Sequence, residues 1–396
     1  MSQDFRFSPK LIAAAIGAVA LAAPLTSALA ADTPDIKITW GGYIKLDALA
    51  SRFSDSAVAQ GSGRDFYVPN SVAVVAPPTA ESGHTYLDSH AKETRLFIKA
   101  DSVIQDHKVG AYVEMDFLVN PGAGNETVTN AYNPGLRRAY ITFDNWLVGQ
   151  DWSTFQNVAA LPEGLDFIGP TEGTVFVRQP MIRYSWNNLQ IALENPETTV
   201  AVNAGTAFAN TDDNSVPDLV MRYNLKAGGA GDYAFATVIR QLADRGTVGG
   251  ARANSTGYGG TISGKIPVLG SDDVRFMVSG GSGIGRYLAI NTVGDAVLDG
   301  AGDIQRLKVI NGFVAYRHAW NEQWRSSIAL SALKASNNAN LGGVITERAQ
   351  SASVNLLYSP IPKLTVGSEL RYAKRTTMAG NDGTLSRLQF SAKYAF

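Results

Sequence analysis

Apolar and polar side chains alternate along most of this chain, in short runs separated by turn-forming residues. The C-terminal run, residues 385–396, shows the pattern most clearly. Leu388, Phe390 and Phe396 fall on one side of an extended strand, whereas Gln389 and Lys393 fall on the other, because successive side chains in a strand point to opposite faces. The same alternation is typical of a half-buried strand in a soluble sandwich, so one segment alone does not decide the fold.

The lengths of the links between these runs decide it. Roughly sixteen runs, an even number, can be read between residue 36 and the C-terminus, and short links near residues 101–108, 144–145, 187–188, 227–231, 267–272, 319–323 and 359–362 alternate with longer ones. The longest fall at about 51–90 and 152–177. A soluble sandwich has no reason to sort its links in this way. The sequence therefore predicts an all-β fold, a transmembrane antiparallel β-barrel of about 16 strands with both termini periplasmic.

The first thirty residues differ from the rest. Arg6 and Lys10 precede an apolar run at residues 11–23, which is followed by Pro24 and by small residues at Ala28 and Ala30. This order predicts a secretory signal peptide over residues 1–30, cleaved near Ala30, with one barrel domain over 31–396 in the outer membrane of a Gram-negative bacterium. The apolar run is too short to span a bilayer, and the chain contains no cysteine.

A barrel of about sixteen strands leaves an aqueous channel, whereas about eight strands fill the interior with side chains. The whole chain carries a formal net charge of -1, but the predicted inward face has eleven basic and five acidic residues. This excess predicts a pore that prefers anions, unless the charges only brace the wall by pairing with one another. The basic residues are Lys45, Arg95, Lys99, Arg138, Arg183, Arg222, Arg240, Arg275, Arg325, Arg371 and Lys393, and the acidic residues are Asp47, Glu114, Asp116, Glu194 and Glu369.

The segment at about 152–177, here called the constriction loop, is expected to fold into the lumen. It contains Trp152, Phe155 and Phe167 to pack it, and its carboxylates are Glu163, Asp166 and Glu172. We expect this acidic loop to face a basic wall across the eyelet, which would set up a transverse field. The expected basic side consists of Arg95, Arg138, Arg178 and Arg183.

Several blocks of the sequence resemble those of the DcaP-like porins. They are Gly42-Tyr43-Ile44-Lys45-Leu46-Asp47, Thr94-Arg95-Leu96, Leu136-Arg137-Arg138-Ala139-Tyr140, Gly149-Gln150-Asp151-Trp152-Ser153-Thr154-Phe155, Leu161-Pro162-Glu163, Leu165-Asp166-Phe167, Gly169-Pro170 and Glu194-Asn195-Pro196. The resemblance implies a sixteen-stranded homotrimeric porin that passes small anionic solutes such as dicarboxylates. The helical coiled-coil extension of that family has no expected counterpart here, so the barrel walls and loops would hold any trimer.

The expected partners follow from this interpretation: the lipid bilayer, lipopolysaccharide, and the barrel-assembly machinery through the strand that ends at Phe396. No cofactor, metal or nucleic acid is expected. A non-selective diffusion porin, an outer-membrane hydrolase and a secreted soluble β-protein are the alternatives. Hydrolysis would need a nucleophile or water beside a base, and no Ser/His/Asp arrangement can be argued from the four histidines. His84 and His90 near Asp88 could bind a metal, although a solvated loop explains them more simply.

Overall fold

The structure, a computed structural model, describes residues 35–74, 83–119, 128–202, 205–248 and 252–396. The expected signal peptide, residues 1–30, lies outside the described residues. The chain divides into two units, Met1–Asp35 and Ile36–Phe396. The second unit contains all the strands of the described ranges.

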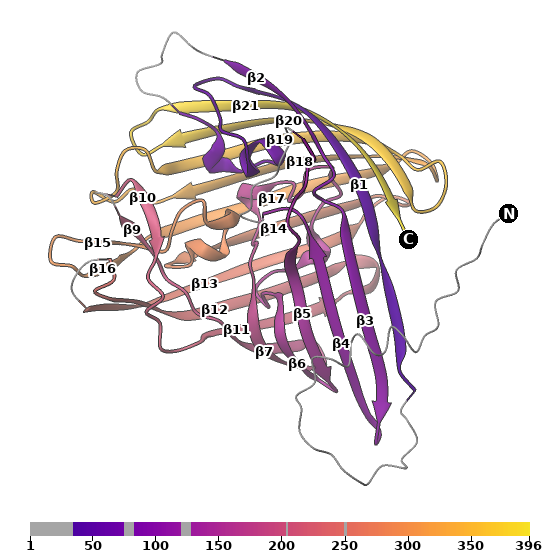
Figure 1. Ribbon diagram of the computed structural model, residues 1–396. Coiled ribbons are helices and arrows are strands. Elements are labelled where there is room, and N and C mark those ends of the chain that lie inside the picture. The colour runs from indigo at the N-terminus through magenta and orange to yellow at the C-terminus, as the bar shows by residue number, and fades with distance from the viewer. Residues whose placement is uncertain (1–34, 75–82, 120–127, 203–204, 249–251) are drawn as a thin grey trace. The chain divides into compact units, whose positions relative to one another are not determined.

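This unit is a closed antiparallel β-barrel, as the sequence predicted (Figure 1). β1 closes the sheet, because its second half pairs with β21 on one side and with β2 on the other, while its first half pairs with β3. β2 and β3 therefore form one crossing interrupted at residues 91–94, and the barrel has sixteen crossings. The barrel strands are β1 (Lys37–Phe53), β2 (His84–His90), β3 (Arg95–Ile104), β4 (His107–Asp116), β5 (Gly135–Phe143), β6 (Trp146–Trp152), β7 (Arg178–Trp186), β8 (Leu189–Glu194), β11 (Asp218–Lys226), β12 (Asp232–Arg245), β13 (Arg252–Pro267), β14 (Asp273–Ser282), β17 (Lys308–Ala319), β18 (Trp324–Ala335), β19 (Thr346–Tyr358), β20 (Leu364–Thr377) and β21 (Asp382–Ala395).

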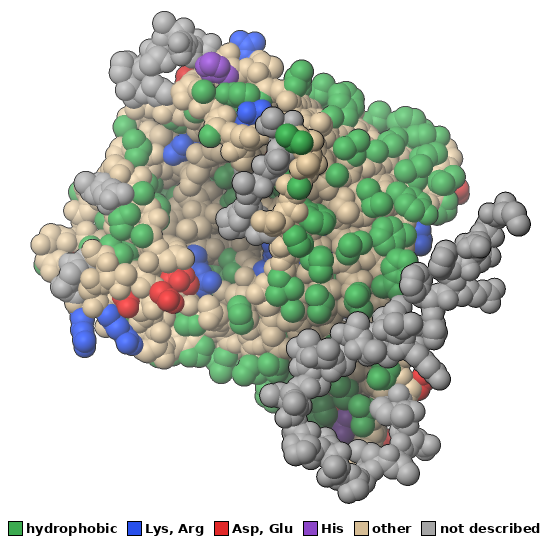
Figure 2. All heavy atoms as spheres, in the orientation of Figure 1, with side chains coloured by type: hydrophobic (Ala, Val, Ile, Leu, Met, Phe, Trp, Pro, Cys, Tyr) green, Lys and Arg blue, Asp and Glu red, His purple; other side chains and the backbone are tan. Residues whose placement is uncertain are grey.

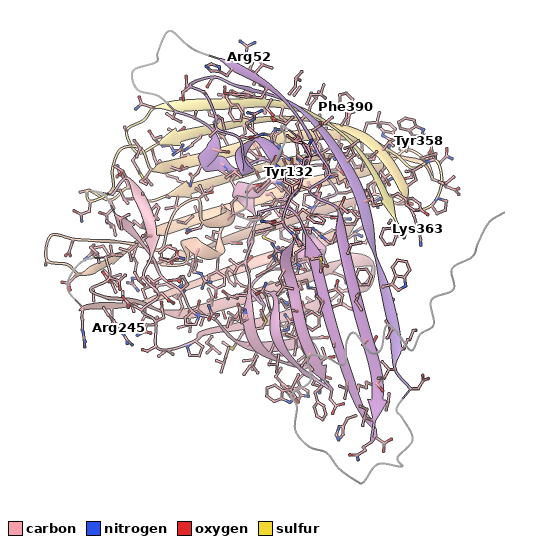
Figure 3. All side chains as sticks on the ribbon, viewed as in Figure 1. Arg52, Tyr132, Arg245, Tyr358, Lys363 and Phe390 are labelled. Carbon is pink, nitrogen blue, oxygen red and sulfur yellow. The ribbon has the colours of Figure 1, made fainter. Side chains whose placement is uncertain are left out.

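The two faces of the strands differ as the alternation predicted. Large apolar side chains such as Leu46 and Phe390 are exposed on the outer wall, and Figure 2 shows hydrophobic side chains spread over that surface. Figure 3 shows Phe390 and Tyr358 on the same wall. At the seam the Phe396 ring packs on Trp40 with ring centroids 5.8 Å apart, and the Phe396 amide donates to the Gly42 carbonyl at 3.1 Å. A closed sheet of this kind pairs its own backbone N–H and C=O groups. This pairing is necessary because the hydrocarbon of a bilayer offers them no hydrogen-bond partners.

The structure corrects the bounds of one predicted loop and determines the phase of one strand. The expected loop at 51–90 is shorter, because β1 continues to Phe53 and residues 84–90 form β2. The strand β2 was not predicted because most of its residues are polar. It completes the crossing to which β3 also belongs. The strand near residues 307–318, whose phase the sequence left open, is β17; it points Ile310 and Val314 outward and Val309 and Phe313 inward.

The short links lie together at one end of the barrel and the longer ones at the other. Residues 105–106, 144–145, 187–188, 227–231, 268–272, 320–323 and 359–363 form the short-turn end, and the loops at 54–83, 153–177, 195–217, 283–307 and 336–345 lie at the long-loop end. In outer-membrane barrels the short turns are periplasmic and the long loops extracellular. By this rule the short-turn end of the barrel faces the periplasm and the long-loop end faces the outside of the cell.

The long loops carry all but one of the remaining elements. A small sheet joins two of them and consists of β9 (Thr199–Val202), β10 (Ala207–Asn210), β15 (Ala296–Leu298) and β16 (Ile304–Arg306). Their helical pieces are α2 (Ser62–Asp65), η2 (Pro69–Ser71), η3 (Val158–Ala160), η4 (Thr171–Gly173), η6 (Gly285–Tyr287) and η7 (Ala289–Asn291), whereas η5 (Gly228–Ala230) lies in the short link at 227–231. Within the described ranges, no helix has the length and apolarity that a membrane crossing needs.

Candidate functional site

The constriction loop follows the inner wall of the barrel over a long arc. It begins at Ser153, since β6 extends to Trp152. Its Asn157 amide donates to a hydroxyl on β13 at 3.0 Å, the Glu163 carboxylate accepts from β18, and the Leu165 amide donates to β20 at 2.8 Å. The loop is therefore fixed to strands on the far side of the lumen from β6 and β7, which it connects.

One glycine permits the closest approach between this loop and the wall. A Cβ added at Gly173 would lie 2.4 Å from the Gly312 carbonyl oxygen of β17, which is nearer than real Cβ atoms approach. We expect Gly173→Ala to push η4 away from the wall and to change single-channel conductance, with the barrel still folded. Gly169→Ala is not a matched control, because Gly169 has φ +86, whereas Gly164→Ala meets only the flexible end of Glu369. Equal conductance of the Gly173 and Gly164 variants would contradict this expectation.

A second inner loop, residues 283–307, covers the constriction loop. The Phe176 amide donates to the Tyr287 carbonyl at 3.0 Å, and the Ala289 amide donates to the Thr174 carbonyl at 2.8 Å. Behind these contacts an apolar cluster joins both loops to the inner faces of β11 to β19. Burial of apolar surface there, at about 25 cal/mol per Å², holds the loops on this side of the lumen.

Arg240 was predicted to line the pore, and this prediction is wrong. Its side chain is fully buried between Asp218 at 3.1 Å and Asp295 at 2.9 Å. Asp295 belongs to the second inner loop, whose inward fold the strand alternation could not reveal. Tyr287 of the same loop donates its hydroxyl to Asp218 at 2.7 Å, and burial raises the pKa of that hydroxyl well above its usual value, which keeps the donor proton in place. Arg240 anchors a loop to the wall.

The opposite wall, formed by β3 to β7, is charged. Arg95 lies 3.2 Å from Asp116, while Arg137 donates to Glu114 at 2.8 Å and also binds Asp116. Arg137 was not among the predicted inward residues, because strict alternation places only one of two adjacent arginines inward. A β-bulge opposite Glu114 makes Arg137 an extra residue, so Arg137 and Arg138 both point inward.

A second pair of arginines shares one carboxylate. Asp151 accepts from Arg138 and from Arg183, each at 2.6 Å. The Arg138 guanidinium also lies over the rings of Tyr112 and Tyr140, at 4.7 and 5.3 Å from their centroids. The side chain of Arg138 is 23% exposed, so solvent inside the barrel reaches it.

Arg178, at the end of the constriction loop, has no carboxylate partner among the described residues. Its guanidinium lies over Trp152 and Phe176, 5.0 and 5.9 Å from their ring centroids. Arg222 on β11 likewise makes no ion pair within the described ranges and donates only to the Gln156 carbonyl, at 2.6 Å. These guanidinium groups keep positive charge that no neighbouring acid of the described chain neutralises.

The β3 to β7 wall therefore holds more positive than negative charge. Five arginines face three carboxylates in this cluster, a formal excess of two positive charges. We call this set the arginine wall. Its members are Arg95, Arg137, Arg138, Arg178 and Arg183, with Glu114, Asp116 and Asp151. Figure 2 shows Lys and Arg side chains within the hollow of the face it presents.

The predicted acidic face of the constriction loop is largely absent from the lumen surface. Asp166 is 6% exposed and Glu172 is fully buried, because the loop turns these two carboxylates toward the wall and toward the loop at 54–83. Glu163 remains partly exposed but binds Arg325 through both carboxylate oxygens, at 2.7 to 2.9 Å. Two of the three acids that were expected to set up a transverse field across the lumen are therefore absent from its surface.

Two further predicted pore residues lie away from the arginine wall. Lys45 is buried with Asp47, at 3.3 Å, and with Glu93, under the tip of the constriction loop. Lys99 remains well exposed and pairs with Asp101 at 2.8 Å near the short-turn end. Lys45 braces the loop, and Lys99 lies at the mouth.

The histidines considered for metal binding have other neighbours. His90 contacts the Asp65 carbonyl at 3.1 Å, and Asp88 forms an ion pair with Arg64. His84 stacks on Tyr86. Across the described residues, no group of three or more His, Cys, Asp or Glu side chains is placed to hold a metal ion.

Comparison with known proteins assigns the chain to a family. A family model described as DcaP outer membrane protein matches residues 26–396. The chain belongs to this family. The family is one of outer-membrane proteins, and the family and the barrel fold together point to a channel rather than an enzyme. A search of the curated proteins gives no match.

Solved structures share the DcaP fold. The outer membrane channel DcaP of Acinetobacter baumannii is 23% identical with a TM-score of 0.73, over 91% of this chain and 97% of that one. The anion-selective porin from Comamonas acidovorans is 10% identical with a TM-score of 0.53, over 91% and 100%. The trimer form of OmpT from Vibrio cholerae is 9% identical with a TM-score of 0.51, over 91% and 99%. At these identities the likeness concerns the fold alone.

Proposed function

We propose that this DcaP family member is an anion-preferring channel for small carboxylate solutes, dicarboxylates above all. The observation that carries the proposal is the formal excess of two positive charges on the arginine wall, with Arg178 lacking a carboxylate partner among the described residues. Charges of one sign in a channel with low-dielectric walls raise the local concentration of counter-ions. The structural relative from Comamonas acidovorans is described as an anion-selective porin, which agrees with this direction.

Two guanidinium groups that make no ion pair among the described residues lie at different levels of the lumen, since Arg222 is level with Ser185 of β7, seven residues from Arg178. Arg178 and Arg222 lie on β7 and β11, which flank β8 in the sheet, and both make no ion pair within the described ranges. A carboxylate of a passing solute can meet these guanidinium groups in turn, and each such charge-assisted contact is short and strong. Binding of this kind must stay weak enough for release, which exposure of the wall to water favours.

The proposal is tested by planar-bilayer recording under a salt gradient. Purified protein should show a reversal potential of the sign that anion preference gives, and added succinate should carry current or interrupt the chloride current. Arg178→Gln should lower the anion preference and weaken the succinate effect several-fold, with the barrel unchanged. A reversal potential near zero would favour the non-selective diffusion porin instead.

The association of three copies and recognition of the terminal strand belong to the same proposal. We propose a homotrimer in the outer membrane, since a structural relative is named in its trimer form. The strand that ends at Phe396 pairs with β1 at the seam, and its C-terminal aromatic is the feature proposed to be recognised by the barrel-assembly machinery. Cross-linking of detergent-solubilised protein tests the trimer, and Phe396→Ser tests assembly through the amount of folded barrel in the membrane.

A further inference from the structure

Four cations lie side by side on the outer wall, on four adjacent strands at the long-loop end. Each points outward, because it occupies the same face of its strand as exposed apolar residues such as Ile310 and Leu330. We call this set the cationic band. Its members are Lys308 on β17, Lys334 on β18, Arg348 on β19 and Lys374 on β20.

The register places these cations in contact range of one another. Lys334 is directly opposite Arg348, while Lys308 lies two residues from Ile310, the partner of Lys334. Lys374 lies two residues from Thr376, the partner of Arg348. Cβ atoms of directly opposed residues are roughly 4.5–5.5 Å apart, and like charges in that position destabilise a sheet. The arrangement is unfavourable unless an anion lies against it.

The acids near the band neutralise only part of its charge. Arg348 lies 3.2 Å from Glu347, and Lys374 lies 2.7 Å from Asp382. Lys308 and Lys334 form no ion pair with any residue that the structure describes. The band therefore keeps two positive charges on a surface that borders the membrane.

An apolar groove lies directly below the band on the same wall. It has a volume of about 600 Å³ and runs across β18, β19, β20, β21 and β1. Small residues open it, among them Ala50, Ala352 and Ser386, and Tyr372 lies beside Lys374 at its upper edge. Arg52 lies at the same edge, and Figure 3 shows Arg52 at one end of the barrel and Lys363 at the other, with Phe390 on the wall between them.

We propose that the cationic band and the groove form a binding site for the phosphorylated glycolipid of the outer leaflet, lipopolysaccharide. The long-loop end of an outer-membrane barrel faces that leaflet. Basic residues near the head-group level attract anionic lipids, and an apolar groove below them accepts an acyl chain. The occupant is a lipid, because the groove continues the hydrocarbon-facing wall directly below the charged head-group level. The site is separate from the lumen and does not depend on which solute the channel passes.

The test compares binding of purified lipopolysaccharide by detergent-solubilised protein. We expect the variant Lys308→Gln/Lys334→Gln/Arg348→Gln/Lys374→Gln to lose roughly 25-fold or more in affinity, since Lys308 and Lys334, which form no ion pair with described residues, should each contribute roughly fivefold near an anionic surface. The matched control removes four cations at the short-turn end, Lys37→Gln/Lys108→Gln/Lys226→Gln/Lys363→Gln, and should bind as the wild type does. Conductance and heat-modifiable migration show that each barrel is folded.

Two further arms identify the ligand and the groove. Dephosphorylated lipopolysaccharide should bind the wild type about as weakly as intact lipopolysaccharide binds the band variant, and millimolar inorganic phosphate should not displace the lipid. Ala352→Trp, which fills the groove without a charge change, should weaken binding several-fold. Equal loss in the band variant and its control, no loss in the band variant, or displacement by free phosphate would each overturn the proposal. A change of oligomeric state in Ala352→Trp with unchanged lipid binding would also overturn it, in favour of a second copy of the chain.

Discussion

The double variant Arg95→Ala/Arg138→Ala is expected to remove the anion preference of the channel. The change takes the arginine wall from a formal excess of two positive charges to none, since three arginines then face three carboxylates. Two unit charges acting on a permeating ion at about 6 Å in water-like surroundings contribute about 1.4 kcal/mol, which favours an anion roughly tenfold and disfavours a cation roughly tenfold, so the anion-to-cation permeability ratio should fall by up to roughly a hundredfold. Reversal potentials under a salt gradient measure this ratio.

The structure indicates that this variant still folds. After the change Asp116 keeps Arg137 and Asp151 keeps Arg183 at 2.6 Å, so neither buried carboxylate is left without a cation. The matched control is Arg245→Ala/Arg252→Ala, which removes two exposed arginines outside the arginine wall. Figure 3 shows Arg245 at the margin of the barrel. An unchanged reversal potential in the Arg95/Arg138 variant, or an equal shift in the control, would exclude the arginine wall as the selectivity filter.

The sequence predicted the barrel because its main determinant is local. Strand alternation and link length depend on neighbouring residues, so the outward position of Phe390 or Leu330 could be read directly from the pattern. The inward position of Arg95, Arg138 and Arg183 followed from the same rule. The rule fails where the ladder is irregular, as at the bulge that turns Arg137 inward beside Arg138.

What the sequence could not predict is how the loops occupy the interior. The second inner loop contains three successive non-glycine residues in the left-handed region, Ala289, Ile290 and Asn291, with φ of 52°, 48° and 58°. Each costs about 1–2 kcal/mol, and no propensity rule predicts such a turn. Ile290 packs against an apolar cluster that also contains Phe66 and Ile168, from two other loops. Contacts among three loops distant in sequence determine this conformation.

The same limitation explains the errors in the candidate site. Inward direction alone does not distinguish a side chain that meets water from one that lies beneath a loop. Arg138 and Arg240 both point inward, yet the first is partly exposed and the second is covered by the second inner loop. The carboxylates of the constriction loop were predicted by charge and position, but their burial depends on where the loop binds the wall. Asp151 and Asp218 were not among the predicted inward acids, and their ion pairs with arginines reduce the uncompensated positive charge further.

Replacing Arg240 by alanine is expected to release the second inner loop from the wall. The change removes the cation that Asp218 and Asp295 share at a fully buried position; Asp218 keeps Arg286 at 3.3 Å, but Asp295 keeps no ion pair among the described residues, and removal of one member of a buried ion network costs about 3–5 kcal/mol. Asp295 lies in the loop and Asp218 on β11, so the cost falls on the contact between them. The sheet pairings of β11 and β12 remain, and the loop opens while the barrel stays closed.

Hydrogen exchange and single-channel recording measure this opening. Amides of residues 283–307 should exchange at least about a hundredfold faster in Arg240→Ala, because about 3 kcal/mol shifts an opening equilibrium by that factor. Conductance should rise and become noisier, since the second inner loop supports the constriction loop through the Phe176 and Ala289 amides. Arg306→Ala is the control, because Arg306 is exposed and, among the described residues, donates to the Thr256 carbonyl and lies over the Tyr258 ring without forming a buried ion pair. Unchanged protection of residues 283–307 would show that the apolar cluster alone holds the loop, so that the buried ion pairs contribute specificity rather than stability.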